Sequence, residues 1–375
     1  MKDVRFALIG GGFMGKAHSI ALASYPMYVW PTDSYPVREV MVEATDDLAD
    51  EAQKRFGFNR KSTDWQGVVN DPSIDVIDIV LPNAMHYEVV MAALAAGKHV
   101  ICEKPLAMTL QQGAAMAELA NKKGLINQTG FNWRLTPAIQ QARKLVDEGV
   151  LGEIRSIRSH WIGEFFADPT IPLVWRFEKA LAGSGALGDL GSHAIDFARF
   201  MCGDFDQVSG MQSTYVTERD KLDGSGKGVV DVDDMTSFIA KFKSGATGYV
   251  ECSWASPGRK TFAGFELYGS QGSIIFDWER MTEFQLYEAD AAGDRQGYKT
   301  VHVGPPHPGG QHFWPIAGYQ IGYADTKVLQ FADFFATLEG RQEKAQTDFA
   351  DGLYCMKVEH AVANSIASRS WQSIH

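Results

Sequence analysis

Lys104, Asp189 and His193 are the side chains whose types and surroundings best suit proton chemistry. Lys104 follows a short apolar run, residues 99–102, which predicts a buried strand that Pro105 keeps from continuing into a helix. Ligands of open α/β sheets bind beyond the carboxyl ends of the strands, where a lysine ammonium group can hydrogen-bond a hydroxyl or carbonyl oxygen. A surface lysine at the start of a loop is the alternative interpretation.

Asp189 and His193 lie in a glycine-rich stretch, residues 183–196. Their spacing of four residues predicts that they share one helical face, about one turn apart. A carboxylate in that position can orient an imidazole, which can then remove a proton from a hydroxyl group. The spacing is equally compatible with Asp189 as a helix N-cap and His193 packed at a domain interface.

The elements that would position these residues begin with an apolar run, residues 4–9, which predicts the first strand of a sheet. A G-x-G-x-x-G motif follows at Gly10, Gly12 and Gly15, and residues 16–22 predict a helix. In a dinucleotide-binding turn, these glycines permit the turn, admit the pyrophosphate and allow close helix–strand packing, and the helix N–H groups face the phosphates. A purely structural glycine turn is the alternative.

Glu43 ends the second predicted strand, residues 40–43, where a carboxylate would bind the ribose hydroxyls of the cofactor. It comes later than the usual spacing, and we interpret residues 25–36 as an inserted loop that accounts for the delay. Asp46 and Asp47 follow instead of basic residues, which favours NAD over NADP. A solvated acid at a strand end is the alternative.

Strands and helices alternate up to residue 124, which predicts a doubly wound parallel sheet in a Rossmann domain over residues 1–128. Beyond it, runs of strands with hairpin turns predict an α+β domain over residues 129–375, built on a large, mainly antiparallel open sheet. Self-association would cover the second face of that sheet. The helix from about residue 349 is expected to pack back toward the first domain, and residues 222–230 are expected to form a mobile surface loop.

The composition excludes several classes of protein. The net charge of −11 over 375 residues argues against binding nucleic acid or an anionic membrane. The four cysteines are far apart and lack zinc spacing, so no metal site is expected. Because neither a signal peptide nor a membrane-spanning run is evident, we expect a cytoplasmic protein.

The glycine loop, Glu103-Lys104-Pro105 and the D-x-G-x-H motif of residues 189–193 together resemble the Gfo/Idh/MocA family of nicotinamide-dependent sugar and cyclitol dehydrogenases. The resemblance covers essentially the whole chain. Within the family, the chain is most similar to the branch of scyllo-inositol/L-glucose dehydrogenases and levoglucosan dehydrogenases. The segments that carry these further similarities are residues 10–15, 25–36, 131–134, 175–177, 314–316 and 349–352.

The resemblance implies that His193 takes the proton of a secondary ring hydroxyl while hydride passes to the nicotinamide of NAD. Lys104 would stabilise the negative charge that develops on the same oxygen, and Asp189 would orient both groups; no metal is required. The expected cofactor-binding residues are Gly10, Gly12, Phe13, Met14, Gly15, Glu43, Pro82, Asn83, His86, Glu103, Lys104, Asn132, Trp175 and Arg176.

Candidate substrate-binding residues must exchange hydrogen bonds with neighbouring hydroxyls, because such directed contacts reject the wrong epimer. Besides the three catalytic candidates, they are Arg134, Glu164, Arg176 and His312. Arg176 stands between two aromatic residues, as expected of a side chain pinned over a pocket. A surface arginine is the alternative.

The predicted activity is oxidation of a secondary ring hydroxyl of a cyclitol or pyranose, of the scyllo-inositol/L-glucose type. We expect a homo-oligomer, a tetramer or dimer, that assembles through the second-domain sheet. A levoglucosan 3-dehydrogenase is an alternative, and an NADPH-dependent keto-sugar reductase is disfavoured by the acids after Glu43. A non-catalytic dinucleotide sensor would not need Lys104, Asp189 and His193 together, and a scaffold would need none of them.

Overall fold

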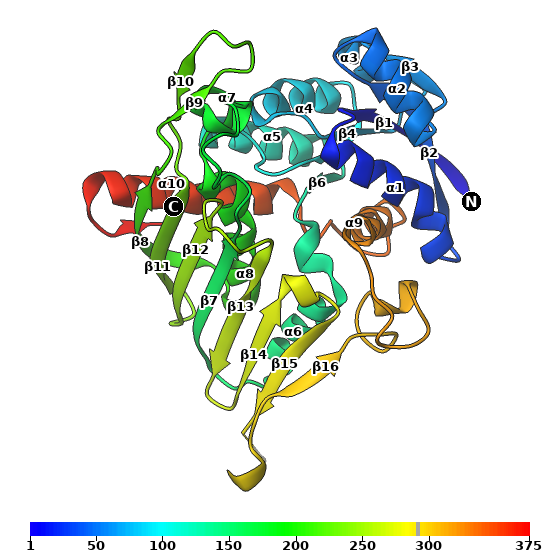
Figure 1. The fold of residues 1–375 in the computed structure, drawn as a ribbon. Coiled ribbons are helices and arrows are strands. Elements are labelled where there is room, and N and C mark those ends of the chain that lie inside the picture. Colours follow the sequence, from blue (N-terminus) through cyan, green and yellow to red (C-terminus); the bar gives the residue numbers. More distant parts are fainter. Residues whose placement is uncertain (290–292) are drawn as a thin grey trace. The chain divides into compact units, whose positions relative to one another are not determined.

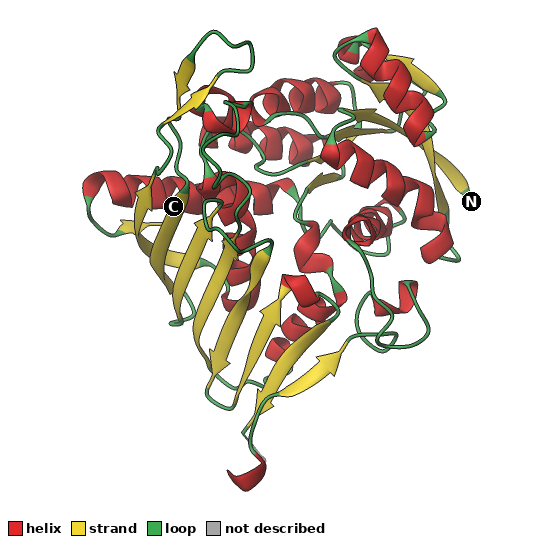
Figure 2. Ribbon diagram, viewed as in Figure 1, coloured by secondary structure: helices red, strands yellow, loops and turns green. Residues whose placement is uncertain are grey.

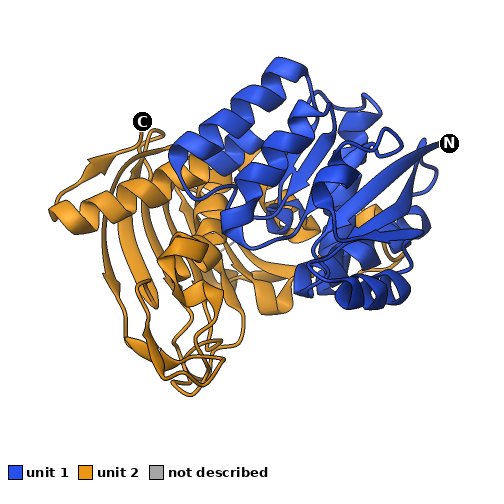
Figure 3. Cartoon of the chain, turned by 90° about the horizontal axis from the view of Figure 1, so that it is seen from above, with its two compact units in different colours: residues 1–135, 321–353 blue, residues 136–320, 354–375 orange. Residues whose placement is uncertain are grey.

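A six-stranded sheet organises the first of two units in the computed structural model, which describes residues 1–289 and 293–375. This unit comprises residues 1–135 and 321–353 (Figure 3). All strand pairs are parallel, in the order β3-β2-β1-β4-β5-β6. The strands are β1 (Lys2–Ile9), β2 (Ser34–Val42), β3 (Arg60–Ser62), β4 (Val76–Ile79), β5 (His99–Cys102) and β6 (Asn127–Thr129). The predicted doubly wound Rossmann sheet is confirmed.

Helices connect these strands, and their ends follow local capping chemistry. Thr109 caps α5 by accepting a hydrogen bond from the N–H of Gln112, and Gly124 ends it in the left-handed conformation. The helices of this unit are α1 (Phe13–Tyr28), α2 (Asp46–Phe56), α3 (Trp65–Val69), α4 (His86–Ala95), α5 (Leu110–Lys123) and α9 (Tyr323–Leu338), with short 3₁₀ turns η1 (Asn83–Met85) and η2 (Asn132–Leu135).

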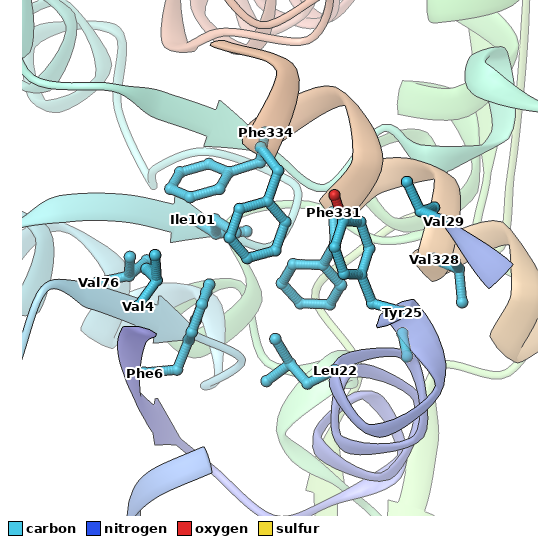
Figure 4. Packing of buried hydrophobic residues seen from close by; sticks show 12 residues of the cluster. Val4, Phe6, Leu22, Tyr25, Val29, Val76, Ile101, Val328, Phe331 and Phe334 are labelled. Carbon is cyan, nitrogen blue, oxygen red and sulfur yellow. The ribbon is translucent and has the colours of Figure 1, made fainter. Parts of the chain in front are cut away.

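Helix α9 belongs to the first unit although the sequence placed residues 129–375 in the second domain. Its aromatic face packs on β1, and the ring centres of Phe331 and Phe334 lie 5.8 and 6.2 Å from that of Phe6 (Figure 4). Burying several aromatic side chains together is strongly favourable. A part of the chain that is distant in sequence therefore completes the core of this unit. The N-terminal part of the unit ends at residue 135.

The prediction of an inserted loop at residues 25–36 is wrong. Helix α1 continues to Tyr28 with Pro26 in its last turn, and β2 starts at Ser34 and contains Pro36. Pro36 is tolerated because β3 pairs only with residues 40–42, so at Pro36 β2 forms the edge of the sheet, where a missing N–H costs little.

A nine-stranded sheet organises the second unit, residues 136–320 and 354–375 (Figure 1). Its order is β16-β15-β14-β13-β7-β12-β11-β8-β17, and only the pair β7–β12 is parallel, which confirms the predicted, mainly antiparallel α+β architecture. The strands are β7 (Ile154–Ile162), β8 (Phe205–Ser213), β11 (Met235–Phe242), β12 (Thr247–Ser253), β13 (Phe262–Gly269), β14 (Gly272–Asp277), β15 (Glu283–Glu288), β16 (Lys299–His302) and β17 (Gln372–Ser373).

Helix α8 (Ser192–Cys202) covers one face of this sheet, where Ser159 of β7 donates a hydrogen bond to the carbonyl oxygen of Ala194 at 2.8 Å (Figure 2). Large side chains on the opposite face, among them Met211, Ile239 and Tyr249, are exposed. The other helices of this unit are α6 (Pro137–Asp147), α7 (Lys179–Ala182) and α10 (Phe349–Ser368, from Tyr354 on), with the short turns η3 (Trp175–Phe177), η4 (Leu187–Gly191), η5 (Trp278–Arg280), η6 (Gly293–Arg295) and η7 (Gly310–His312).

The prediction of a mobile surface loop at residues 222–230 is partly wrong. Strands β9 (Glu218–Asp220) and β10 (Lys227–Val229) form an antiparallel hairpin, with Gly224 and Gly226 at positive φ in its turn. The four cysteines are buried as free thiols. In the two described ranges, none of the helices combines the length and apolar character needed to span a bilayer.

Candidate active site

The glycine loop between β1 and α1 has the geometry that a dinucleotide requires. Gly10 has φ +107°, and a Cβ atom on Gly15 would lie 2.2 Å from the carbonyl oxygen of Gly10, so the fold itself needs both glycines. At Gly12, by contrast, a Cβ atom would meet no described atom within 4 Å. The open space beside Gly12, at the N-terminus of α1, fits a pyrophosphate group held by helix N–H groups.

Glu43 lies beside this loop. Its Oε1 accepts a hydrogen bond from the N–H of Gly11 at 2.5 Å, and its Oε2 accepts one from the N–H of Ala44 at 3.2 Å. Asp46 and Asp47 follow in the first turn of α2, and the side chain of Thr45 caps that helix. Glu43 therefore lies among acidic side chains and contacts the backbone of the glycine loop, which would hold the phosphates.

Lys104 lies two residues beyond the end of β5, where the sequence placed it, and is half-buried. The neighbouring loops are joined by His86, whose ring nitrogens lie 2.9 Å from the carbonyl oxygens of Pro105 and Leu81. Burial lowers the pKa of His86, which is completely enclosed. Both ring nitrogens of His86 thus lie at hydrogen-bond distance from loop carbonyl oxygens, and its expected contact with the cofactor stays a prediction.

Glu103 lies in a buried group of four ionisable side chains, which we call the Glu103 cluster. His18 Nε2 is 3.0 Å from the Glu103 carboxylate, His18 Nδ1 is 2.9 Å from Asp78, and the Lys327 ammonium group donates to Glu103. Since both ring nitrogens of His18 face carboxylates, both must donate, and the imidazole is protonated. Two positive charges then balance two negative ones in the protein interior.

The pKa directions agree with this assignment. Burial lowers the pKa of His18, but the charge of Asp78 and the hydrogen bonds to both carboxylates outweigh it, and the net pKa is raised. Burial raises the pKa of Glu103, but the charge of Lys327 and the contacts with His18 more than reverse this, so its pKa is lowered. The Glu103 carboxylate joins α1 to α9 through His18 and Lys327, and His18 in turn contacts Asp78 of β4. The expected contact of Glu103 with the cofactor stays a prediction.

Asp189 and His193 do not lie on one regular α-helix, which is what their spacing predicted. Asp189 lies in a turn of π-helix, η4, and His193 lies in the first turn of α8. Because a π-turn holds more residues than an α-turn, the spacing of four residues no longer fixes how the two side chains face each other. His193 is buried, and its ring centre is 5.2 Å from that of Trp161 in an edge-to-face contact.

In the structure, Arg176 forms an ion pair with Asp189. Its Nε lies 3.3 Å from Asp189 Oδ2, and its guanidinium carbon lies 4.3 Å from the ring centre of Trp175. Both side chains of the ion pair are partly exposed, 39% for Arg176 and 29% for Asp189. The pair therefore presents donors and acceptors to solvent, as a polar binding site requires.

Asp233 holds the turn that carries Asp189, a role the sequence did not reveal. Its carboxylate accepts hydrogen bonds from the N–H groups of Gly185 and Leu187 at 2.9 and 2.8 Å. A Cβ atom on Gly185 would lie 2.0 Å from the carbonyl oxygen of Asp233, so only glycine fits. The acidic run at residues 231–234 was the available signal.

The other substrate candidates have contacts within their own units. Arg134 is buried and donates to the carbonyl oxygen of Gln346 at 2.8 Å. Glu164 accepts a hydrogen bond from the N–H of Gly258 at 2.6 Å and contacts the Lys260 ammonium group. His312 ends the turn η7 in a loop of the second unit.

The remaining cofactor candidates occupy loop and turn positions. Phe13 is exposed at the start of α1, its ring 5.5 Å from that of Tyr323, and Met14 contacts the Tyr323 hydroxyl. Pro82 and Asn83 begin the turn after β4. Asn132, which is buried in η2, donates to Thr326 Oγ1 at 2.6 Å.

A parallel Rossmann sheet with this glycine loop, followed by an α+β domain with a large antiparallel sheet, defines a class of two-domain, dinucleotide-dependent oxidoreductases. The chain belongs to the Gfo/Idh/MocA oxidoreductase family. Residues 4–131 match its NAD-binding Rossmann-fold model, and residues 139–275 match a model of its C-terminal domain. The resemblance inferred from the motifs is thus confirmed.

Relatives are similar over the full length. The levoglucosan dehydrogenase of Pseudarthrobacter phenanthrenivorans is 43% identical, over 100% of this chain and 99% of that protein. The scyllo-inositol 2-dehydrogenase (NAD(+)) of Bacillus subtilis is 29% identical over 97% of this chain and 94% of that protein. A solved structure of levoglucosan dehydrogenase in complex with NADH and levoglucosan has a TM-score of 0.97 and 43% identity, with 100% of both chains covered.

Proposed function

We propose that this chain is an NAD-dependent dehydrogenase that oxidises a secondary ring hydroxyl of a levoglucosan-type anhydro sugar to a ketone. The observation that carries the proposal is the 43% identity with a levoglucosan dehydrogenase over the whole chain. This reverses the order expected from the sequence, which put scyllo-inositol or L-glucose first. The scyllo-inositol dehydrogenase is less similar, at 29% identity.

The first unit supplies the residues that would hold the cofactor. When bound, NAD supplies the hydride acceptor. The N–H groups at the start of α1 bind the pyrophosphate, and the Glu43 carboxylate accepts hydrogen bonds from the ribose hydroxyls. The negative charges of Asp46 and Asp47 repel a 2′-phosphate, so NADP binds less well.

The proton chemistry falls to Lys104, Asp189 and His193. His193 accepts the proton of the reacting hydroxyl, and Lys104 donates a hydrogen bond to the same oxygen as negative charge develops on it. Asp189 orients these groups. Arg176, paired with Asp189, donates to a neighbouring hydroxyl, which restricts the epimers that can bind.

The exposed face of the nine-stranded sheet supports a further proposal, that this protein is a homo-oligomer. Met211, Ile239 and Tyr249 lie on that face with exposed fractions of 60%, 48% and 39%. A second copy would bury these side chains, as expected for an open sheet with one uncovered face. Sedimentation of the chain, compared with that of an Ile239→Lys variant, tests this assembly.

The activity is tested by the absorbance of reduced nicotinamide after mixing the protein with NAD or NADP and one sugar. The panel consists of levoglucosan, scyllo-inositol, myo-inositol, L-glucose and D-glucose. Turnover with NAD and a preference for levoglucosan support the proposal. A preference for an inositol or L-glucose would move the chain to the other substrate class, and no turnover on the panel despite NAD binding would reject the proposal.

The roles are tested by Lys104→Met and His193→Asn. Each should lower kcat by about 10²- to 10⁴-fold, because each removes a group that acts only at the reacting oxygen. Thermal unfolding should be unchanged in both variants, and NAD binding should be unchanged in His193→Asn. The matched control is Lys54→Met, since Lys54 forms an exposed ion pair with Asp50 on α2.

A further inference from the structure

The hairpin β9–β10 carries one arginine, Arg219, whose side chain is fully buried. Its Nη1 donates to the carbonyl oxygens of Asp168 and Ile171 at 2.8 and 3.0 Å, and its Nη2 donates to that of Phe166 at 2.6 Å. Its guanidinium carbon lies 4.2 Å from the ring centre of Phe177. All these contacts fall on residues 166–177, which we call the 166–177 segment.

The hydrogen bonds of Arg219 go to backbone carbonyl oxygens and not to a carboxylate. Burial lowers the pKa of Arg219, and the charges of Asp234 and Asp168 oppose that effect. An arginine nevertheless keeps its charge in a protein, and a buried charge is tolerated only where hydrogen bonds replace water. The guanidinium group therefore fixes the three carbonyl groups, since its buried charge requires their hydrogen bonds.

Two further links join the hairpin to the same segment. The N–H of Leu173 donates to the carbonyl oxygen of Asp220 at 2.8 Å, next to a bridge between Leu173 and Lys221. Beyond the hairpin, the N–H of Asp231 donates to the carbonyl oxygen of Phe177 at 3.3 Å. The hairpin thus contacts the segment in its middle and at its end, beside α7 in Figure 1.

The 166–177 segment ends in the turn that presents Arg176 to Asp189. Phe177, the next residue, packs its ring 4.8 Å from that of Phe166 and 6.0 Å from that of Trp254. Arg219 stacks on the same ring. The backbone at Arg176 is therefore fixed by buried contacts on one side, while its own side chain is partly exposed.

We propose that Arg219 is a positioning residue that, through the 166–177 segment, holds Arg176 against Asp189 and so controls turnover of the sugar. This inference rests on the proposed function, in which Asp189 belongs to the catalytic set. Arg219 itself touches neither sugar nor cofactor. Its effect on the reaction must therefore pass through Arg176.

A double-mutant cycle tests this dependence. Arg219→Met should lower kcat/KM for the sugar by about 10- to 100-fold, as expected for a displaced binding group, while the Kd for NAD stays within about twofold. Arg176→Met should also lower kcat/KM, and adding Arg219→Met to it should cause no further loss. If the two losses multiply instead, Arg219 acts independently of Arg176 and the proposal is overturned.

Two more variants separate positioning from folding. Arg219→Lys should give an intermediate loss, because one ammonium group cannot reach three carbonyl groups and stack on Phe177; it replaces Arg219→Met in the cycle if that variant does not fold. The control is Arg55→Met, since Arg55 stacks on Phe56 at the exposed surface of α2. Its kcat/KM should stay within about twofold of the wild type.

Hydrogen exchange distinguishes a failure of this inference from a failure of the proposed function. If the wild type oxidises none of the sugars, the proposed function fails, and the positioning role of Arg219 is judged by amide exchange alone. Faster exchange confined to the 166–177 segment in Arg219→Lys supports this positioning role. Unchanged exchange in that segment overturns the positioning role, whatever the activity of the wild type.

Discussion

The two units place buried charge beside their proposed active groups in different ways. In the first, the Glu103 cluster balances two cations with two carboxylates, and Lys104 follows directly in the chain. In the second, Arg219 is a single buried cation held by carbonyl oxygens, and Arg176 and Asp189 lie partly exposed at the end of the segment that it holds. The difference indicates that the Glu103 cluster stabilises the first unit, whereas in the second unit the charge of Arg219 fixes the backbone of the 166–177 segment.

Removing one charge from the Glu103 cluster should have the largest effect on stability. Lys327→Met removes one of the two cations and leaves the cluster with a net negative charge, so the free energy of unfolding should fall by about 3–5 kcal/mol in a urea titration. Adding Glu103→Gln should restore part of the loss, because the orphaned charge is removed as well.

The control is Lys344→Met, which breaks the ion pair between Lys344 and Asp348 at the surface. It should lower the free energy of unfolding by at most about 1 kcal/mol. Equal effects of Lys327→Met and Lys344→Met would show that the buried cluster is not what stabilises the first unit.

The protonated state of His18 predicts an intermediate, pH-dependent effect. Because its pKa is raised in the folded protein, its contribution to stability is complete below the unfolded pKa of about 6.5 and is lost as pH rises through the folded pKa. Above about pH 6.5 the wild type should therefore lose stability relative to His18→Gln, by at most about 1.4 kcal/mol per pH unit.

Urea titrations at several pH values measure this difference. His360→Gln, at an exposed histidine of α10, serves as the control and should follow the wild type at every pH. Parallel curves for the wild type and His18→Gln would mean that His18 is neutral, and the charge balance assigned to the cluster would then be wrong.

The smallest effect on stability is expected at Asp189. Asp189→Asn breaks a partly exposed pair with Arg176 and should change the free energy of unfolding by less than about 1 kcal/mol. Its kcat for the sugar should nevertheless fall by about 10²-fold or more, because in the proposed function the carboxylate orients the reacting groups. A large loss of stability with little change in kcat would reverse the contrast between the two units.

Local chemistry made much of the first unit predictable. β5 matches its predicted range, residues 99–102, and α5 begins at a threonine cap and ends at a glycine, because an apolar run and such end signals act over a few residues. The glycine loop is equally local. The π-turn at Asp189 was not predictable from spacing, since Gly185 and Leu187 are held by Asp233, 48 and 46 residues away in the chain, at hydrogen-bond distances of 2.9 and 2.8 Å.

The sequence by itself determined the Rossmann sheet, the family and the candidates Lys104, Asp189 and His193, since motif and strand signals lie within short stretches. Only the tertiary structure decided what holds these residues. His18 meets Glu103 across 85 residues and Lys327 meets it across 224, while Arg219 reaches Phe166 across 53. Such partners carry no local signal, because a buried charge can be balanced by any suitable group that the fold brings near it.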